Sequence, residues 1–240
     1  MEKLIAIDMK EGVGARVKRL FPPLPQKVHY DPFVLMDEFF VEPGKGFPDH
    51  PHQGFEGITY MINGGITHCD SLGNSDTIIA GQAQRFTSGP GFSHSETPTA
   101  EGARGIQLWV RLAKSLHKDP PAYQCQKSLI QTKSGNVTRC KIVDANAGIT
   151  LKTEAEFTEW VITENEELAL PNQAGWRHVA YVSQGSLQHG DHLLAPGEGL
   201  TWTATSDAPL NLNASKNTRF FTYSAKPHGE KIILHGPFVK

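Results

Sequence analysis

Short segments that alternate apolar and polar residues run through much of this chain and favour a fold built from β-strands. Residues 57–62 (GITYMI) and 105–112 (GIQLWVRL) are two such segments. Alternation places successive side chains on opposite faces of a strand, so that one face can pack against a core. The 23 glycines and 16 prolines interrupt the chain too often for long helices. The pattern predicts an all-β sandwich or barrel, with a hairpin connection at residues 70–76.

An internal repeat indicates two similar β-domains. Residues 60–70 resemble residues 181–191 at a constant offset of 121, and Gly81 then matches Gly197 at an offset of 116. A chance match between turn-rich segments is the competing explanation, and we favour duplication.

The seam between the halves is expected at residues 118–124 (KDPPAYQ), because paired prolines cannot continue a strand or a helix. The sequence therefore predicts an N-terminal domain over residues 1–124 and a C-terminal domain over residues 125–240.

The composition argues against several other classes of protein. A formal net charge of −2 gives no basic footprint for direct binding of nucleic acid. The first residues lack the apolar core of a signal peptide, and no apolar run approaches the length that spans a membrane. Cys69, Cys125 and Cys140 are odd in number and lack CxxC spacing, which is typical of reduced thiols. We expect a soluble cytoplasmic protein, with a nuclear pool if the source is eukaryotic.

Two pairs of potential metal ligands carry the functional signal. His50 and His52 lie in the segment GFPDHPHQGFE, and His94 and Glu96 lie in the segment GFSHSE. Residues two apart on a strand share a face, so two facing strands would aim three imidazoles and a carboxylate at one point. A mixed His/carboxylate set with open positions is typical of a catalytic first-row metal site, and iron is the first expectation.

The repeat provides an internal control for these ligands. At the repeat offsets, the four candidates fall on residues that bind no metal: Pro171, Gln173, Leu210 and Leu212. Two leucines at this spacing are what a strand facing a core carries. Burying a histidine and a glutamate there without partners costs several kcal/mol, which a bound metal would offset. The C-terminal domain is therefore expected to be metal-free.

The ligand segments also resemble a known family. Residues 44–64 are similar to the first cupin motif and residues 89–96 to the second, with Glu96 where the usual cupin pattern has no carboxylate. The amino-acid sequences of four segments resemble the pirin family in particular: residues 31–40, 46–56, 84–96 and 105–110. The resemblance is dense from about residue 30 to 125, thin through the second half, and returns at HGPFV, residues 235–239.

The resemblance implies a fold of two tandem cupin (jelly-roll-like) β-barrels. The N-terminal barrel of that family binds the metal, the C-terminal one does not, and the closing tail returns to the N-terminal domain. Matched residue by residue, the family's single iron would be held here by His50, His52, His94 and Glu96. Fe(II) is expected first, with Mn, Ni, Co, Cu and Zn as alternatives, because this donor set accepts all of them.

Neighbouring residues carry less specific signals. Glu56 shares strand parity with the two histidines of its segment, so it either orients an imidazole or lies on the barrel rim. Three departures from the family pattern, in each case at a position commonly occupied by arginine or tryptophan, are candidates to line the pocket mouth and leave substrate and partner specificity open: Gln53, Arg85 and Pro90.

The other histidines have ordinary structural interpretations. His68 and His189 occupy equivalent places in the two halves, each two residues before an aspartate, so we assign both a structural role. Histidines without a pairing partner are assigned to the surface or to packing: His117, His178, His192, His228 and His235. Arg104 is taken as a loop residue. Apolar residues near the motifs are assigned to the core first and to pocket lining second: Phe47, Phe55, Tyr60, Met61, Phe92 and Trp109.

The resemblance implies a quercetin 2,3-dioxygenase, which opens flavonol rings with O2. Glu96 is the expected base for the flavonol 3-hydroxyl, with Glu56 in reserve, since a carboxylate beside a metal and an apolar wall has a tuned pKa. The partners would be a flat aromatic substrate and O2, with no nucleic acid and no membrane. A second hypothesis, also implied by the family, is an iron-containing regulatory protein that senses redox state and contacts a transcription factor or an enzyme. A third is a cupin with another small-molecule substrate.

Overall fold

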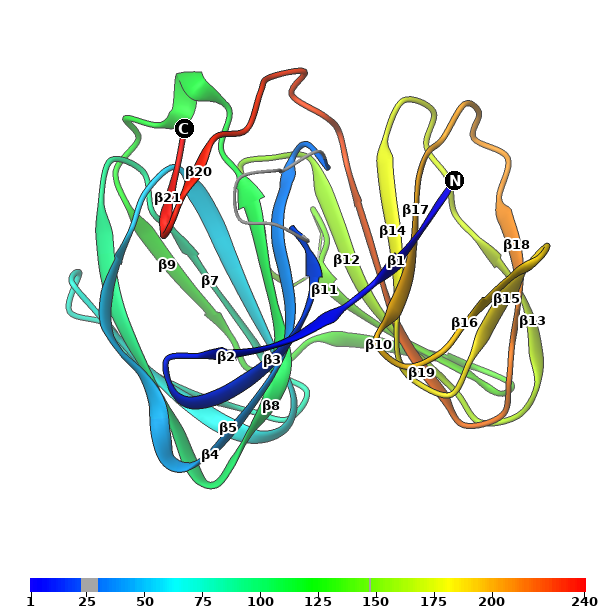
Figure 1. Ribbon diagram of the computed structural model, residues 1–240, viewed down its shortest axis with the longest axis horizontal. Helices are drawn as coiled ribbons and strands as arrows, with labels where there is room; N and C mark the ends of the chain where they lie inside the picture. The colour runs from blue at the N-terminus through cyan, green and yellow to red at the C-terminus, as the bar shows by residue number, and fades with distance from the viewer. Residues whose placement is uncertain (23–29, 147) are drawn as a thin grey trace. The chain divides into compact units, whose positions relative to one another are not determined.

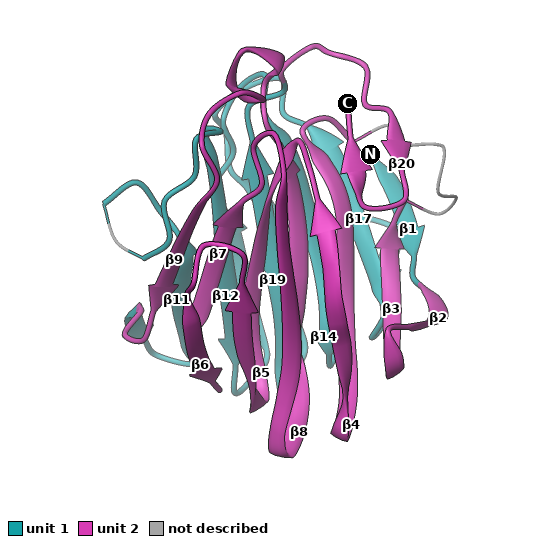
Figure 2. Cartoon of the chain, turned by 90° about the vertical axis from the view of Figure 1, so that its left-hand side faces the viewer, with its two compact units in different colours: residues 1–6, 130–227 teal, residues 7–129, 228–240 magenta. Residues whose placement is uncertain are grey.

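The computed structural model describes residues 1–22, 30–146 and 148–240, which fold almost entirely into β-strands (Figure 1). Within these residues the helical structure is one 3₁₀ turn, η1 (Lys114–Leu116), and no helix is long and apolar enough to cross a membrane. The all-β prediction is confirmed. The chain divides into two compact units, shown in different colours in Figure 2: unit 1 consists of Met1–Ala6 and Ile130–Pro227, and unit 2 of Ile7–Leu129 and His228–Lys240.

Unit 2 contains the predicted metal ligands. Its main sheet has the order β2-β3-β4-β8-β5-β7-β9, with β6 paired to β5. The bounds are β2 (Ile7–Glu11), β3 (Val13–Phe21), β4 (Phe33–His52), β5 (Phe55–Asp70), β6 (Ser75–Ile79), β7 (Ala83–Thr87), β8 (Phe92–Arg111) and β9 (Ala122–Gln126). The long strand β8 lies between β4 and β5, so residues of all three strands meet along its length.

Alternating apolar side chains fill the interior of unit 2. One cluster gathers Ala15, Val17, Phe39, Val41, Met61, Ile66, Ile78 and Ala103, and a second gathers Val34, Phe55, Phe86, Phe92, Ile232 and Val239. Burial of this apolar area is the main favourable term in folding such a sheet. The second cluster matters most for function, because it adjoins the predicted ligands.

The predicted hairpin at residues 70–76 is confirmed. Strand β5 ends at Asp70 and pairs with β6, which begins at Ser75. The side chain of Asp70 organises the turn, since its Oδ1 atom accepts the backbone N–H groups of Leu72 (2.9 Å) and Asn74 (3.0 Å). This is the local bonding that makes aspartate a frequent turn residue.

A C-terminal tail, residues 228–240, belongs to unit 2 and forms the hairpin β20 (Leu234–His235) and β21 (Phe238–Val239). Gln53, at the turn after β4, forms a parallel bridge with Phe238, and the N–H of Val239 donates to the Gln53 carbonyl at 2.9 Å. Val239 is completely buried in the second apolar cluster. The tail therefore packs directly against the residue that follows the candidate ligand His52.

Unit 1 has two sheets, of order β1-β17-β14-β19-β12-β11-β10 and β13-β18-β15-β16. The first contains β1 (Glu2–Ile5), β10 (Ile130–Ser134), β11 (Val137–Val143), β12 (Ala155–Ile162), β14 (Arg177–Gln184), β17 (Glu198–Thr203) and β19 (Thr218–Ala225). The second contains β13 (Glu166–Leu170), β15 (Leu187–His189), β16 (His192–Leu194) and β18 (Leu210–Ala214).

The leucines that replace the candidate ligands in the repeat lie in the core of unit 1. Leu210 and Leu212 are buried in its apolar cluster, and in the β13–β18 ladder Leu210 pairs with Leu170. Because His94 pairs with His50 in unit 2, the structural counterpart of His50 is Leu170. The alignment of the repeats by sequence placed His50 on Pro171, so it is displaced by one residue from the structural correspondence at this strand.

The expected boundary between residues 124 and 125 differs from the division in the structure. That position lies inside β9, which pairs with β7 of unit 2, so the chain leaves unit 2 only after Leu129. The two prolines at 120 and 121 precede β9 and end the irregular segment, but they do not end the domain. The first strand also departs from the simple division, because β1 pairs with β17 in unit 1.

Replacing Leu210 by alanine is expected to lower the free energy of unfolding by about 2–5 kcal/mol, because it leaves a cavity in the core of unit 1. Leu193→Ala is the control: this side chain is 58% exposed, so its loss should change stability by less than about 0.5 kcal/mol. Chemical denaturation of both variants measures the difference. Equal, small losses would contradict the assignment of Leu210 to the core.

Candidate metal centre

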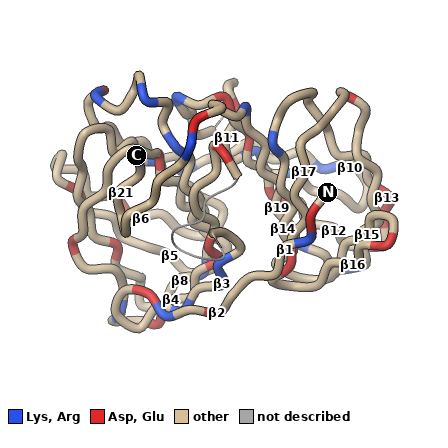
Figure 3. The backbone as a smooth tube through the Cα atoms, turned by 45° about the horizontal axis from the view of Figure 1, so that its top comes forward, with Lys and Arg blue, Asp and Glu red and all other residues tan. Residues whose placement is uncertain are grey.

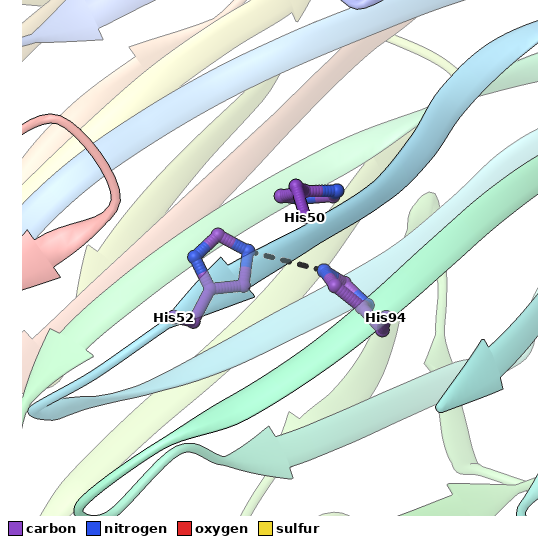
Figure 4. A group of neighbouring side chains, drawn as sticks. All are labelled: His50, His52 and His94. Carbon is purple, nitrogen blue, oxygen red and sulfur yellow. Dashed lines mark hydrogen bonds between the residues drawn. The ribbon is translucent and has the colours of Figure 1, made fainter. Parts of the chain in front are cut away.

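The ends of β4 and β8 bring three predicted ligands together. His50 is the cross-strand partner of His94, and His52 lies two residues further along the same face of β4. One ring nitrogen from each of the three lies within 4.8 Å of the others. The rings of His50, His52 and His94 converge in Figure 4, where a dashed line joins His52 and His94. His52 and His94 are buried, whereas His50 is partly exposed.

Burial favours the neutral form of the His52 and His94 imidazoles, which is the form that binds a metal. Desolvation, followed by the neighbouring His50, lowers the pKa of His52 to about 3, although the Pro237 carbonyl opposes the shift. Desolvation and the surrounding histidines lower the pKa of His94 well below its ordinary value. A cluster of this kind cannot hold several protons at neutral pH.

The hydrogen bonds leave ring nitrogens free to coordinate. Nδ1 of His50 donates to the Pro48 carbonyl at 2.8 Å, which leaves Nε2 as the ring nitrogen that can coordinate. The Nε2 atoms of His52 and His94 face each other at 3.1 Å. Nδ1 of His52 is buried and makes no hydrogen bond of ordinary geometry within the described part of the chain. These ring nitrogens fit a bound divalent cation.

Glu96 follows His94 on the same face of β8 and is almost completely buried. Nε2 of Gln84 donates to Oε1 of Glu96 at 2.9 Å. The Thr59 hydroxyl lies 3.3 Å from the same oxygen, but it lies closer, at 2.8 Å, to Oε1 of Gln107. Burial with so few donors raises the pKa of Glu96 to about 7, against the opposing effect of the hydrogen bonds from Thr59 and Gln84.

The four predicted ligands do not form one compact group; they form parts of two groups that share His94. The first is His50, His52 and His94; the second is His68, His94 and Glu96, again with one donor atom each within 4.8 Å. Both lie in unit 2, and they are the groups of this kind that the described residues form. The structure thus places Glu96 beside His94 but adds His68 to the neighbourhood.

His68 is the functional candidate that the sequence interpretation missed. It was assigned a structural role because the second half retains a copy, His189. The copies differ in the structure: His68 is completely buried, whereas His189 is partly exposed and its Nδ1 donates to the Asn211 carbonyl at 2.7 Å. The pairing of His68 with Glu96 across β5 and β8 could have identified it, but that register is not visible in the sequence.

Glu56 lies away from the centre, so the expectation that it shares a face with the ligands is wrong. The turn at Gly54, where φ is +85°, separates β4 from β5 and breaks the alternation on which the expectation depended. Thr59, which faces Glu96, is three residues after Glu56, so the two point to opposite faces of β5. The completely buried Glu56 carboxylate instead accepts a hydrogen bond from Thr87 at 2.8 Å.

The three departures from the family pattern have different surroundings. Arg85 is on the Glu56 side of the sheet, where it donates to Thr87 at 2.7 Å, and burial lowers its pKa against the opposing charge of Glu56. Pro90 lies in the exposed turn between β7 and β8. Gln53 alone adjoins a predicted ligand, and its backbone pairs with the C-terminal tail. We therefore find no common pocket mouth formed by the three.

Aromatic rings enclose the histidines. His52 stacks on Phe86 with ring centroids 5.2 Å apart and meets Phe55 and Trp109 edge-on at 5.1 Å each. His68 stacks between Phe92 and Tyr123, at 6.1 and 4.6 Å. Three predicted aromatics thus face the centre, while Phe47 and Met61 pack in the other apolar cluster of unit 2. Phe86 and Tyr123 were not predicted.

Comparisons with known proteins agree with this architecture. The Pirin family model matches residues 14–110, and the model described as the Pirin C-terminal cupin domain matches residues 157–240. Pirin-like protein 2 of Arabidopsis thaliana is 32% identical over 253 residues, covering all of this chain and 78% of the relative. This chain belongs to the pirin family. Its fold of two cupin domains follows from the same matches.

Solved structures share the fold. The structure of quercetin 2,3-dioxygenase from Acinetobacter baumannii aligns with a TM-score of 0.88 and 26% identity, over 100% of this chain and 90% of that one. The bacterial pirin YhhW from Escherichia coli, in complex with nickel(II), aligns with a TM-score of 0.79 and 19% identity, over 94% and 99% of the two chains.

Replacing Glu96 by glutamine is expected to remove a pH dependence from the stability of the metal-free protein. Because folding raises the pKa of Glu96 from 4.5 to about 7, the folded state keeps a proton that the unfolded chain releases above pH 4.5. The wild type should therefore lose about 2–3 kcal/mol of unfolding free energy, relative to Glu96→Gln, between about pH 5 and about pH 8. Denaturation in the presence of a chelator measures this difference. If the unfolding free energies of the two proteins changed with pH in parallel, the raised pKa of the buried Glu96 carboxyl would be contradicted.

Proposed function

We propose that this pirin is a metal-dependent dioxygenase that opens the ring of flavonols such as quercetin with O2. The observation that carries the proposal is the cluster of three imidazoles, two of them buried, beside a buried carboxyl group and aromatic rings. The relationship to the Acinetobacter protein named quercetin 2,3-dioxygenase supports this choice of substrate.

The residues that would hold the metal are His50, His52, His94 and Glu96. Imidazole and carboxylate donors together suit Fe(II), which is the metal we propose, and they also accept Mn, Ni, Co, Cu or Zn. The nickel complex of YhhW is an example of metal binding by a bacterial pirin. When bound, such a metal supplies Lewis acidity that activates the substrate and O2.

Glu96 is suited to take the proton of the flavonol 3-hydroxyl. In the metal-free protein burial raises the pKa of Glu96 to about 7. A bound cation would lower that pKa, so the carboxylate would be ionised and able to accept a proton. Gln84 fixes one carboxylate oxygen by donating to it at 2.9 Å, which leaves the other oxygen to face the metal and the substrate hydroxyl. The proton from the hydroxyl would then reside on Glu96, and the electron-rich flavonolate is the species that reacts with O2.

The surrounding rings suit a flat aromatic substrate. The rings of Phe55, Phe86 and Trp109 pack around His52. Such surfaces bind planar rings through burial and offset stacking and keep water from the reacting centre. Basic and acidic residues are interspersed along both units, as Figure 3 shows, so a neutral small molecule is a better match than a nucleic acid.

Metal-loaded wild-type protein should bleach quercetin in air, with one O2 consumed per flavonol. Glu96→Gln should lower kcat by about 10²–10⁴-fold, because the variant cannot accept the hydroxyl proton. Absorbance and oxygen-electrode traces measure both quantities.

Glu56→Gln is the matched control for that substitution. It changes a buried carboxyl group on the opposite face of β5, so turnover should remain. Wild-type protein that holds metal but leaves quercetin intact would contradict the dioxygenase and favour the regulatory alternative or another small substrate. Unchanged activity in Glu96→Gln would remove Glu96 from the mechanism.

A further inference from the structure

Two buried polar side chains, those of His68 and Asp70, form a hydrogen-bonded row that leads away from the predicted ligand His94 on the side opposite His52. Nδ1 of His94 lies 3.2 Å from Nδ1 of His68, and Nε2 of His68 lies 3.1 Å from Oδ2 of Asp70. The side chains of His68 and Asp70 have no solvent exposure. We call this row the Asp70 relay. Strand register builds it, since Asp70 of β5 is the cross-strand partner of His94 of β8.

The Asp70 end of the relay is anchored as an acceptor. Its Oδ1 atom receives the backbone N–H groups of Leu72 and Asn74, and its Oδ2 atom receives Nδ2 of Asn74 at 2.9 Å. Burial raises the pKa of Asp70, but hydrogen bonds from Asn74 and His68 outweigh this and leave the pKa below its ordinary value. The carboxylate is therefore charged, and its orientation is fixed by the turn between β5 and β6.

Each hydrogen bond in the relay determines the next. Because the Asp70 carboxylate can only accept, Nε2 of His68 carries the proton. The Nδ1 atoms of His68 and His94 lie 3.2 Å apart, so one of them must donate and the other accept. With its proton on Nε2, a neutral His68 ring has only a lone pair on Nδ1 and therefore accepts. The proton of the His94–His68 bond then resides on Nδ1 of His94. In a neutral ring this leaves the lone pair on Nε2, the atom that faces His52.

We propose that His68 and Asp70 are positioning residues that hold His94 in the tautomer and orientation in which Nε2 can bind the metal. The inference rests on the proposed metal site and deepens it, since it assigns a role to two residues outside the predicted ligand set. A carboxylate that fixes a ligand imidazole in this way typically changes metal affinity by about 10–100-fold.

The equivalent His-x-Asp pair of unit 1 does not orient a ligand histidine. His189 and Asp191 retain the spacing, but Nδ1 of His189 donates to the Asn211 carbonyl at 2.7 Å and the ring is partly exposed. The position of His94 is occupied there by Leu210, which has no ring to orient. Only in unit 2 does the His-x-Asp pair end on a candidate ligand, within the residues that the structure describes.

Tyr123 supports the relay by packing against His68. Its ring stacks on His68 with centroids 4.6 Å apart and an interplanar angle of 14°. Its hydroxyl donates to Oε1 of Gln84 at 3.1 Å, which turns the Gln84 amide N–H toward Glu96. The same tyrosine thus packs against the residue that orients His94 and orients the residue that holds Glu96.

Asp70→Asn tests the direction of the relay. The backbone donors of the turn should keep the amide oxygen in the Oδ1 position, so the amide N–H₂ would face His68. Both histidines would then reverse their tautomers, placing a proton on Nε2 of His94. We expect Co(II) affinity, measured by competition with a chromophoric chelator, to fall by about 10–100-fold. Asp191→Asn is the matched control and should leave the affinity unchanged.

Two substitutions of His68 separate positioning from packing. Glutamine can donate to Asp70 and accept from His94, so His68→Gln should keep affinity close to that of the wild type. Phenylalanine preserves the stacking on Tyr123 but cannot accept, so His68→Phe should lose affinity as Asp70→Asn does. This pair decides the question even if Asp70→Asn does not fold.

The tautomers can be read without metal. Long-range ¹H–¹⁵N spectra of ¹⁵N-histidine-labelled apoprotein should show His94 protonated on Nδ1 in the wild type and on Nε2 in Asp70→Asn. Equal Co(II) affinities of Asp70→Asn and Asp191→Asn, or an Nε2-protonated His94 in the wild type, would overturn the proposal. So would paramagnetic shifts showing that His68 itself coordinates Co(II). None of these readouts uses quercetin, so a failure of the dioxygenase assignment is separately visible.

Discussion

The register between β4 and β8 is the constraint on which the centre depends. It sets His50 opposite His94 and places His52 one step along the same face. Because side chains alternate along a strand, a slip of β4 by one residue would turn His50 and His52 away from the interior and from His94. The three imidazoles and the carboxylate of Glu96 are costly to bury, and the apolar clusters of unit 2 supply the burial that holds the strands in this register. A bound metal would then offset the cost of the polar groups.

The two units show what the centre adds to a common scaffold. In unit 1 the ladder between β13 and β18 pairs Leu170 with Leu210, and these side chains join a continuous apolar core. At the corresponding pair in unit 2, His50 and His94 stand instead, with aromatic rings and a hydrogen-bonded row around them. The scaffold thus tolerates either filling, and the chemistry resides in which side chains occupy a few inward positions.

Much of this arrangement was predictable from the sequence. Alternation and frequent turns indicated the all-β class, and the two i, i+2 motifs identified three residues that the structure does bring together. Glu56 was misplaced because alternation does not continue through the turn at Gly54. His68 was missed because its role depends on pairing between β5 and β8, which local spacing cannot reveal. The domain boundary was misjudged because β9, after the two prolines, still pairs within unit 2.

The central claim is that unit 2 holds one divalent metal through His50, His52, His94 and Glu96. The most direct measurement is the metal-to-protein ratio by mass spectrometry on untagged protein after anaerobic reconstitution with Fe(II), with His94→Ala beside it. We predict about one metal per wild-type chain and its loss in the variant, since His94 belongs to both candidate ligand groups. Absence of metal from the reconstituted wild type, or equal metal in the two proteins, would contradict the account.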